Sequence, residues 1–421
     1  MKSKTSIRAG VSIEKGLGFF DGALEEADVA SFAWNLLHED LSLPTAVLYE
    51  DRLKHNLAWM QRFANAYSVK LAPHGKTTMA PKLFDMQLKT GAWGITLATA
   101  QQTQVAHHHG VRRVLMANQL IGKENMAIIS RLIEDAEFEY YCLVDSAAQI
   151  ELLGSFYSQP AQRLHVLLEL GMLGGRTGIR DGEQLNAALT ALERWPDTLV
   201  LSGIEIYEGV LDDEALIRDF LQRAVAVTRK LIAEKRFRRM PILLSAAGSA
   251  WYDVVADIFT KAALGDAVEI VLRPGCYLTH DAGSYREAQA NIMQRNSVAS
   301  RMQAGLLPAL QIWAYVQSIP EPENAIVTMG KRDASFDAGL PIPAQQYRPG
   351  DTGPRPAPGH WLLTRMMDQH AFLKIARDDD VRIGDMLAFD ISHPCLTFDK
   401  WRTLPVLDAQ YRVIDVIRTF F

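Results

Sequence analysis

Lys76 stands directly after a short apolar run, in the stretch LAPHGKTT over residues 71–78. If that run is a strand of a barrel, the lysine amine points into the mouth of the barrel, where it can react with a carbonyl group. A lysine that follows a strand is more often a solvated loop residue. The catalytic interpretation therefore depends on which residues follow the later strands.

Eight short apolar runs alternate with segments whose apolar residues have helical spacing. The runs are 70–74, 94–99, 113–118, 140–145, 164–170, 199–207, 241–248 and 267–274. Such alternation is typical of parallel strands joined by crossover helices, and eight units predict an α/β fold with a closed (β/α)8 TIM-like barrel. An open, doubly wound sheet is the competing architecture.

The pattern differs on both sides of these runs. A strand-like segment at 45–49 and a helix over 52–67 precede them. After residue 274, Pro, Gly and Asp are more frequent, and antiparallel strands are predicted at 310–316, 325–329, 361–364, 371–375 and 412–417. We predict an N-terminal arm over 1–43 that packs on a β-rich domain, a barrel over 44–292, and the β-rich domain over 293–421.

Composition limits the class of protein. The 421 residues are 48% hydrophobic and 22% charged, which suits a globular chain of two domains. The net charge is -5 and the basic residues are scattered, so we expect neither a nucleic-acid nor a membrane partner. Three distant cysteines, Cys142, Cys276 and Cys395, argue against a disulfide framework and for a reducing, cytoplasmic location.

Several polar or glycine-rich positions fall at the same end of the predicted barrel as Lys76. They are Arg176 after the fifth strand, Tyr207 at the end of the sixth, Gly248 and Ser249 after the seventh, and Gly275, Cys276 and Tyr277 after the eighth. Loops after the last two strands of such barrels often bind phosphate, and the helical run 251–263 begins just after Ser249. A lysine opposite a phosphate-binding loop suggests pyridoxal phosphate. Each glycine or serine alone is more often a turn residue or a helix cap.

These positions lie in motifs that resemble a known family. The motifs are PHGKT (73–77), GAWG to AT (91–99), RTG (176–178), 203–207, 245–249 and RPG (273–275). They resemble the alanine-racemase-like (fold type III) pyridoxal-phosphate enzymes, and among them the D-threonine aldolase and D-serine dehydratase (D-serine deaminase) family. The resemblance extends from about residue 44 to the C-terminus and implies a homodimer.

The resemblance also implies roles for individual residues. Lys76 would form the Schiff base with pyridoxal phosphate, Arg176 would lie near its phenolic oxygen, and Tyr207 near its ring nitrogen. The phosphate would be held by Gly248, Ser249, Gly275 and Tyr277.

The same family has a metal site in its C-terminal domain, and this chain has His393 and Cys395 two positions apart. In an extended segment both side chains would lie on one face. An imidazole beside a thiolate suits Zn2+ better than Mn2+ or Mg2+. A buried cysteine next to a loop histidine is the alternative interpretation of the pair. His370 could contact the metal site, act as an acid or be structural.

We expect a lyase that eliminates water from a D-3-hydroxy amino acid, most simply D-serine to pyruvate and ammonia. Two features weaken assignment to the aldolase branch: Thr78 stands where many D-threonine aldolases have a histidine, and the segment from Glu169 to Arg176 is longer than usual. Retro-aldol cleavage of a D-threonine-like substrate, D-3-hydroxyaspartate as the substrate, and a non-catalytic pyridoxal-phosphate-binding protein remain alternatives. The long C-terminal domain argues against the last of these.

Overall fold

A computed structural model describes residues 14–20, 26–159 and 161–421 of the chain. These residues form two compact units. The barrel unit comprises Leu57–Tyr277 and Ala288–Gly305, and the β unit comprises the described residues up to Asn56, with Leu278–Glu287 and Leu306–Phe421. The β unit is therefore assembled from three separate parts of the chain.

Within the described residues, an eight-stranded parallel sheet forms the centre of the barrel unit. Its strands are β2 (Lys70–Leu71), β3 (Ile95–Leu97), β4 (Arg113–Gln119), β5 (Glu139–Val144), β6 (Leu164–Leu170), β7 (Leu199–Ile206), β8 (Ile242–Ala246) and β9 (Val268–Leu272). The sheet runs from β3 through β9 to β2, and a parallel bridge between His74 and Thr96 joins its two ends. The predicted barrel and its eight strands are confirmed.

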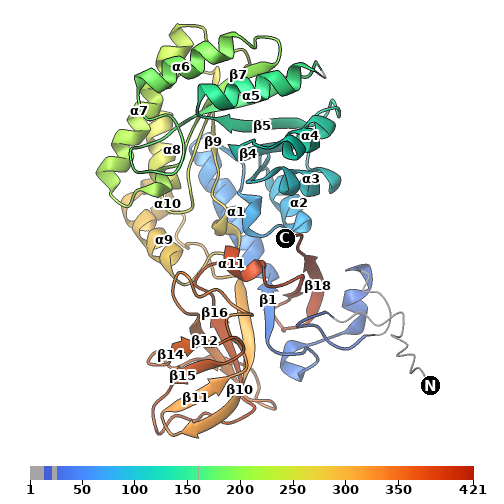
Figure 1. Cartoon of the computed structure of the whole chain (residues 1–421). Helices are drawn as coiled ribbons and strands as arrows, with labels where there is room; N and C mark the ends of the chain where they lie inside the picture. The colour runs from blue at the N-terminus through green and yellow to red at the C-terminus, as the bar shows by residue number, and fades with distance from the viewer. Residues whose placement is uncertain (1–13, 21–25, 160) are drawn as a thin grey trace, which may run out of the picture. The chain divides into compact units, whose positions relative to one another are not determined.

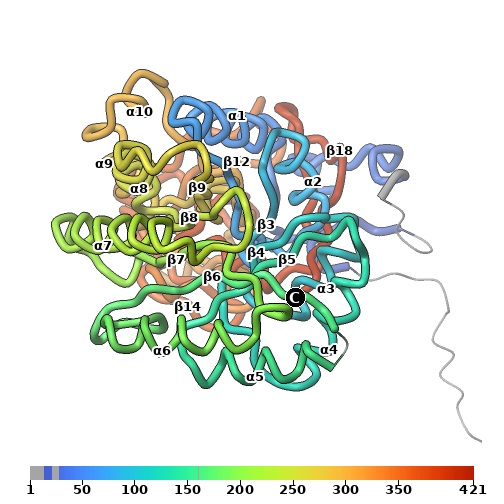
Figure 2. The backbone as a smooth tube through the Cα atoms, turned by 90° about the horizontal axis from the view of Figure 1, so that it is seen from above, coloured from blue at the N-terminus to red at the C-terminus, as the bar shows by residue number. Residues whose placement is uncertain are grey.

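Helices lie around the outside of these strands (Figures 1 and 2). They are α1 (Glu50–Ala66), α2 (Pro81–Thr90), α3 (Ala100–His108), α4 (Lys123–Leu132), α5 (Ala147–Ser158), α6 (Gly182–Glu193), α7 (Glu214–Ala233) and α8 (Tyr252–Lys261). Local sequence sets several starting points. Thr99, Ser146 and Asp181 each accept a hydrogen bond from a backbone N–H of the first helical turn, which satisfies a donor that has no partner inside the helix.

The β unit contains, among the residues that the structure describes, a ten-stranded and mostly antiparallel sheet. Its strands are β1 (Thr45–Tyr49), β10 (Leu310–Glu321), β11 (Asn324–Val327), β12 (Ile342–Tyr347), β13 (Arg355–Pro356), β14 (Leu362–Met366), β15 (Ala371–Lys374), β16 (Met386–Asp390), β17 (Thr403–Leu407) and β18 (Val413–Arg418). The C-terminal β-rich domain is confirmed. β1 belongs to this sheet, where it lies between β10 and β17.

The division between the units differs from the predicted boundary at residue 293. Helix α9 (Ser284–Arg295) crosses that point and α10 (Ser297–Arg301) follows it, and the residues Ala288–Gly305 belong to the barrel unit. Their side chains explain this, because Tyr252 of α8 donates to Gln289 Oε1 at 2.7 Å and Arg295 Nε donates to Asp253 Oδ2 at 2.8 Å. The described part of the predicted arm lies in the β unit, where Leu17, Phe20 and Trp34 share a core cluster with Trp313 of β10.

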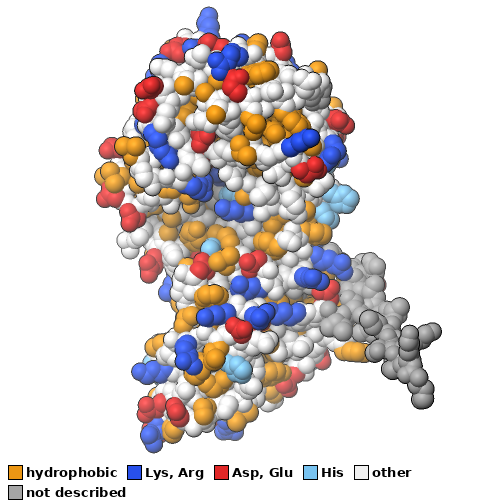
Figure 3. All heavy atoms as spheres, in the orientation of Figure 1, with side chains coloured by type: hydrophobic (Ala, Val, Ile, Leu, Met, Phe, Trp, Pro, Cys, Tyr) orange, Lys and Arg blue, Asp and Glu red, His pale blue; other side chains and the backbone are white. Residues whose placement is uncertain are grey.

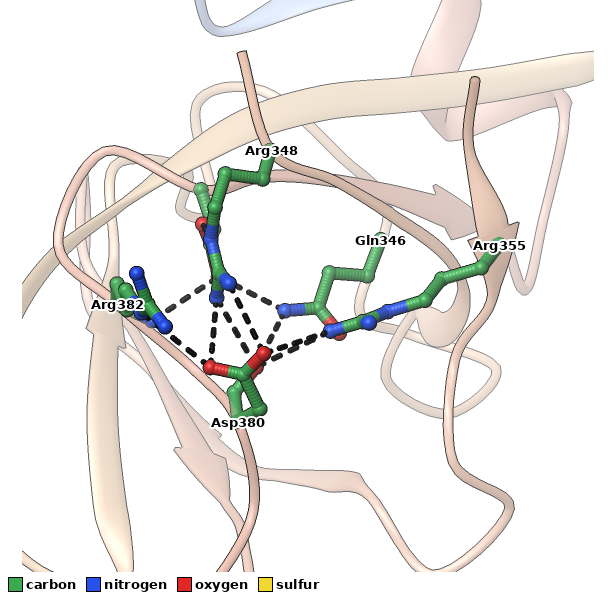
Figure 4. Close-up of polar contacts among 6 residues, drawn as sticks. Gln346, Arg348, Arg355, Asp380 and Arg382 are labelled. Atoms are coloured by element: carbon green, nitrogen blue, oxygen red, sulfur yellow. Dashed lines mark hydrogen bonds and ion pairs between the residues drawn. The ribbon is translucent and has the colours of Figure 1, made fainter. Parts of the chain in front are cut away.

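An ion-pair cluster joins β12 and β13 to the loop before β16 (Figure 4). Arg348 donates to Asp380 Oδ2 at 2.9 Å and to Asp385 Oδ1 at 2.8 Å, and Gln346 donates to Asp385 Oδ2 at 2.8 Å. Asp385 is buried, so these partners replace the water that would otherwise solvate its carboxylate. Arg355 and Arg382 add further ion pairs to Asp380.

On the face drawn in Figure 3, basic and acidic side chains are mixed over the surface. None of the helices in the described residues has the length and apolar character that crossing a membrane requires.

Candidate active site

Lys76 lies in a short turn, η3 (Gly75–Thr77), that follows β2. A Cβ at Gly75 would come within 2.7 Å of Phe84 and 2.8 Å of Ile95, so only glycine lets the turn pass this close to its neighbours. Lys76 itself is exposed, whereas Thr77 beside it is buried. The turn therefore holds the lysine at the carboxyl end of its strand, as the sequence predicts.

The imidazole of His74 lies beside this lysine. Burial lowers its pKa well below 6.5, and the nearby charges of Lys76 and Arg273 add to the effect. Its Nδ1 atom is buried and has no hydrogen-bond partner among the described residues. His74 is therefore neutral, with one polar atom that remains available to a bound group.

Arg176 and Tyr207 come together at the same end of the barrel. Arg176 is exposed in the loop after β6, and its guanidinium lies 5.1 Å from the centroid of the Tyr207 ring. Tyr207 follows β7, and burial raises the pKa of its hydroxyl. Both residues line a small cleft of about 10 Å³, together with Glu169 and Thr177.

Glu169, near the end of β6, holds the loop that carries Arg176. Thr177 Oγ1 donates to Glu169 Oε1 at 2.6 Å, and Gln119 donates to Glu169 Oε2. A hydrogen bond thus connects the residue after the long segment from Glu169 to Arg176 with the strand on which this segment begins.

The loops after β8 and β9 bring Ser249 to Gly275. The backbone N–H groups of Gly275 and Cys276 donate to Ser249 Oγ at 3.2 and 3.1 Å. A Cβ at Gly275 would lie 2.7 Å from Thr77 Oγ1 and 2.9 Å from His74 Cβ. Glycine thus allows the last barrel loop to approach the turn that carries Lys76. The cap of α8 is Trp251, so Ser249 does not cap that helix.

Two other residues predicted to hold phosphate have protein partners. The hydroxyl of Tyr277 is buried and accepts a hydrogen bond from Gln87 at 3.2 Å. The N–H of Gly248 donates to Glu208 Oε1 at 2.7 Å. Sequence reasoning missed Glu208, although an acidic residue directly after Tyr207 at a strand end was a signal that could have found it.

A layer of buried polar side chains lies at the carboxyl ends of strands β7, β8 and β9. Arg273 donates to Glu205 Oε1 and, at 3.0 Å, to Ser245 Oγ. Burial raises the pKa of Glu205 to about 7, while the charge of Arg273 acts in the opposite direction. These contacts join β7, β8 and the residue after β9, and so hold the strand ends that carry Tyr207, Ser249 and Gly275 in fixed register.

His393 lies in the β unit between β16 and α11 (Cys395–Phe398), and Cys395 is the first residue of α11. Pro394 has helical dihedral angles (φ -60°, ψ -45°), so the expectation of an extended segment is wrong. The two side chains nevertheless meet, because the helical turn brings Cys395 back toward the imidazole. Hydrogen-bond contact with Cys395, together with Asp337, raises the pKa of His393 to about 9.

Asp337, in the loop before β12, is a further member of this group. Its Oδ2 atom lies 2.7 Å from His393 Nδ1. The sequence offered no signal for it, since 56 residues separate the two. His370 is exposed in the turn between β14 and β15, where its carbonyl accepts the N–H of Met367 at 2.8 Å.

Comparison with known proteins relates both units to described families. The model of the family "Alanine racemase, N-terminal domain" matches residues 49–279, which is more than half of the chain. The model "Putative serine dehydratase domain" matches residues 309–407.

Among curated proteins, the chain is similar to the 3-hydroxy-D-aspartate aldolase of Paracoccus denitrificans, with 21% identity over 308 residues, 72% of this chain and 76% of the relative. It is also similar to the D-threo-3-hydroxyaspartate dehydratase of a Delftia species, with 27% identity over 139 residues, 33% of this chain and 36% of the relative.

Solved structures share the fold. The D-threonine aldolase from Filomicrobium marinum has a TM-score of 0.75 at 20% identity, and the match covers 92% of this chain and 97% of that one. A histidine-to-alanine variant of D-threo-3-hydroxyaspartate dehydratase has a TM-score of 0.71 at 21% identity, covering 94% and 98%. From the match over residues 49–279 and the eight-stranded barrel, we conclude that this chain belongs to the alanine racemase N-terminal domain family.

Proposed function

We propose that this protein is a pyridoxal-phosphate-dependent lyase that eliminates water from a D-3-hydroxy amino acid. The observation that carries the proposal is the set of groups at the carboxyl ends of the barrel strands: the Lys76 amine, Arg176 over Tyr207, and the N–H groups that converge on Ser249. We propose D-serine as the substrate, with pyruvate and ammonia as products. The names of the relatives support the wider class of D-3-hydroxy amino acids.

The residues at these strand ends fit pyridoxal phosphate. The N–H groups of Gly275 and Cys276 hold the oxygen of Ser249, which leaves the Ser249 hydroxyl proton as a donor that suits a phosphate group. Lys76 and Arg176 add positive charge. When bound, the cofactor supplies an electron sink for the charge that develops at the substrate Cα.

The chain's own residues have separate tasks in this proposal. The Nζ atom of Lys76 takes the proton from Cα, as a general base. His74 beside it is neutral, because burial lowers its pKa. Arg176 and Tyr207 orient the bound ring, and the layer of Glu205 and Arg273 keeps their strands in register.

The pair His393 and Cys395 fits a metal ion, because an imidazole and a thiol in contact form a nitrogen and sulfur donor set that suits zinc. In the part of the chain that the structure describes, no three His, Cys, Asp or Glu side chains gather as a metal site. Two protein ligands leave positions for water or a substrate hydroxyl. When bound, zinc would act as a Lewis acid for a hydroxide leaving group.

Solved structures of a relative support the proposed metal. Solved variants of D-threo-3-hydroxyaspartate dehydratase carry alanine at a histidine and at a cysteine two positions apart, and the cysteine variant is described as the metal-free form. His393 and Cys395 have the same spacing.

Retro-aldol cleavage is the second candidate function. The match to 3-hydroxy-D-aspartate aldolase covers 72% of this chain, whereas the match to the dehydratase covers 33%. Cleavage would give glycine from D-threonine or 3-hydroxy-D-aspartate, and a base would take the hydroxyl proton in place of the α-proton.

One assay separates these functions. Purified protein loaded with pyridoxal phosphate is given D-serine, D-threonine or D-threo-3-hydroxyaspartate, with L-serine as the control. Release of ketoacid, aldehyde and glycine is measured before chelation, after chelation and after zinc is restored. Pyruvate from D-serine alone, lost on chelation and recovered with zinc, is the expected result. Glycine and an aldehyde without ketoacid would move the protein to the aldolase function, and inertness toward every substrate would contradict both.

A further inference from the structure

The loop after β8 contains a backbone conformation that a residue with a Cβ rarely adopts. Ala247 has a φ of 82°, in the left-handed region, and it is buried. Gly248 and Ser249 follow it immediately. Because such conformations persist only where the surroundings enforce them, this loop needs a specific brace.

The carboxylate of Glu208 provides that brace. It is fully buried, and its two oxygens accept one backbone hydrogen bond each: from Ala247 N–H at 3.0 Å and from Gly248 N–H at 2.7 Å. Burial raises the pKa of Glu208, and the two N–H groups act in the opposite direction. Both donors of the strained segment are thus satisfied by one side chain.

Glu208 also connects this loop to the end of β7. It follows Tyr207 directly, and a Cβ at Gly248 would lie 3.2 Å from the Tyr207 ring. The residue that orders the loop is therefore held by the strand that presents Tyr207.

The hydrogen bonds to Glu208 determine which donors of this loop can still bind an anion. The N–H of Gly248 is committed to Glu208. Ser249 accepts the N–H groups of Gly275 and Cys276, so its one hydroxyl proton remains to be donated. A phosphate would meet the Ser249 hydroxyl as a donor.

We propose that Glu208 is a positioning residue for the cofactor phosphate, because it fixes the Ala247–Gly248 backbone in the conformation that presents the Ser249 hydroxyl. This inference rests on the proposed function, since it concerns the group that the same site would bind.

The test uses Glu208→Gln and two probes, pyridoxal phosphate and pyridoxal, which lacks the phosphate. The glutamine amide has one acceptor oxygen, and its NH2 group faces a backbone N–H, so one of the two hydrogen bonds is lost. We expect the dissociation constant of pyridoxal phosphate to rise at least tenfold, with that of pyridoxal unchanged. Glu134→Gln, at an exposed acid of the same unit, is the matched control and should change neither.

Equal weakening of both probes, or no weakening of either, would overturn the inference. If Glu208→Gln does not fold, the double variant Glu208→Gln/Ala247→Gly is compared with Ala247→Gly alone, because glycine adopts a φ of 82° without strain. A wild-type protein that takes up no pyridoxal phosphate would overturn the proposed function and this inference together, whereas normal uptake by the variant overturns the inference alone.

Discussion

His393 and Asp337 form a close pair, with Nδ1 of the imidazole 2.7 Å from Oδ2 of the carboxylate. A carboxylate on one ring nitrogen fixes the tautomer and orientation of the ring, so that the other nitrogen faces a metal. We predict that Asp337→Asn weakens zinc affinity by about 10- to 100-fold. Competition with a chromophoric chelator measures this. Asp378→Asn, at an exposed position of the same unit, is the control, and equal affinity in both variants would contradict the role of Asp337.

Lys76→Ala should abolish covalent uptake of pyridoxal phosphate and lower the rate of product release by about three orders of magnitude or more, because no amine remains to form the bond or take the α-proton. The absorbance of the bound cofactor and the ketoacid assay measure the two effects. Lys70→Ala, at the opposite end of the same strand, should leave both unchanged. Retained covalent uptake in Lys76→Ala would place the reactive amine elsewhere.

Gly275→Ala should weaken both stability and cofactor binding. The new Cβ would lie 2.7 Å from Thr77 Oγ1 and 2.9 Å from the backbone oxygen of His74, and relief requires the two loops to separate. We expect a loss of about 1–3 kcal/mol in the free energy of unfolding, measured by denaturant titration. At Gly182 a Cβ meets nothing within 4 Å, so Gly182→Ala should cost far less. If Gly275→Ala changed neither the free energy of unfolding nor cofactor binding, the two loops would be able to separate without loss of stability.

His165 should make the stability of the barrel unit dependent on pH. Burial, with the charges of Arg239 and Arg163, lowers its pKa to about 4, from an ordinary value of about 6.5. Between these values the unfolded chain binds a proton that the folded chain does not, so stability is full above about pH 6.5 and falls as the pH drops toward 4. The loss should be about 1–3 kcal/mol. Chemical unfolding at several pH values measures it, and a wild-type slope in His165→Gln would contradict the assignment.

Arg348→Met should destabilise the β unit. The substitution leaves the buried carboxylate of Asp385 without its guanidinium partner, at a cost of about 2–4 kcal/mol. Arg377→Met removes an exposed arginine whose nearest acid, Glu323, is 4.0 Å away, and it should cost less than about 1 kcal/mol. Thermal and denaturant unfolding compare the two, and equal losses would show that the cluster in Figure 4 adds little.

The barrel could be predicted because each of its strands is a short apolar run between amphipathic segments. β12, β13 and β17 could not, since Pro343 and Pro405 read as turn signals and β13 has two residues. β16 (Met386–Asp390) has four apolar residues in a row. Such a continuous run has no periodicity that would distinguish a strand from a buried helix segment.

The same limit applies to the site. Lys76, Tyr207 and Ser249 could be proposed because they follow predicted strands. Asp337 could not, because its partner His393 is distant in sequence and only the fold joins them. The position of Glu208 beside Tyr207 was a signal, but its bonds to the Ala247–Gly248 backbone could not be predicted, because they join residues that are distant in sequence. A pattern along the chain identifies groups that share a strand end, but it does not identify a carboxylate that orients them.

The position of β1 has a consequence for synthesis. Thr45–Tyr49 leaves the ribosome early, yet its partners are β10, which begins at Leu310, and β17, which begins at Thr403. During translation this apolar segment, which is buried in the folded protein, has neither of its partner strands until the barrel residues have been synthesised. Truncation from either terminus would leave the same sheet incomplete, so the chain cannot be divided at a single point into two expressible fragments.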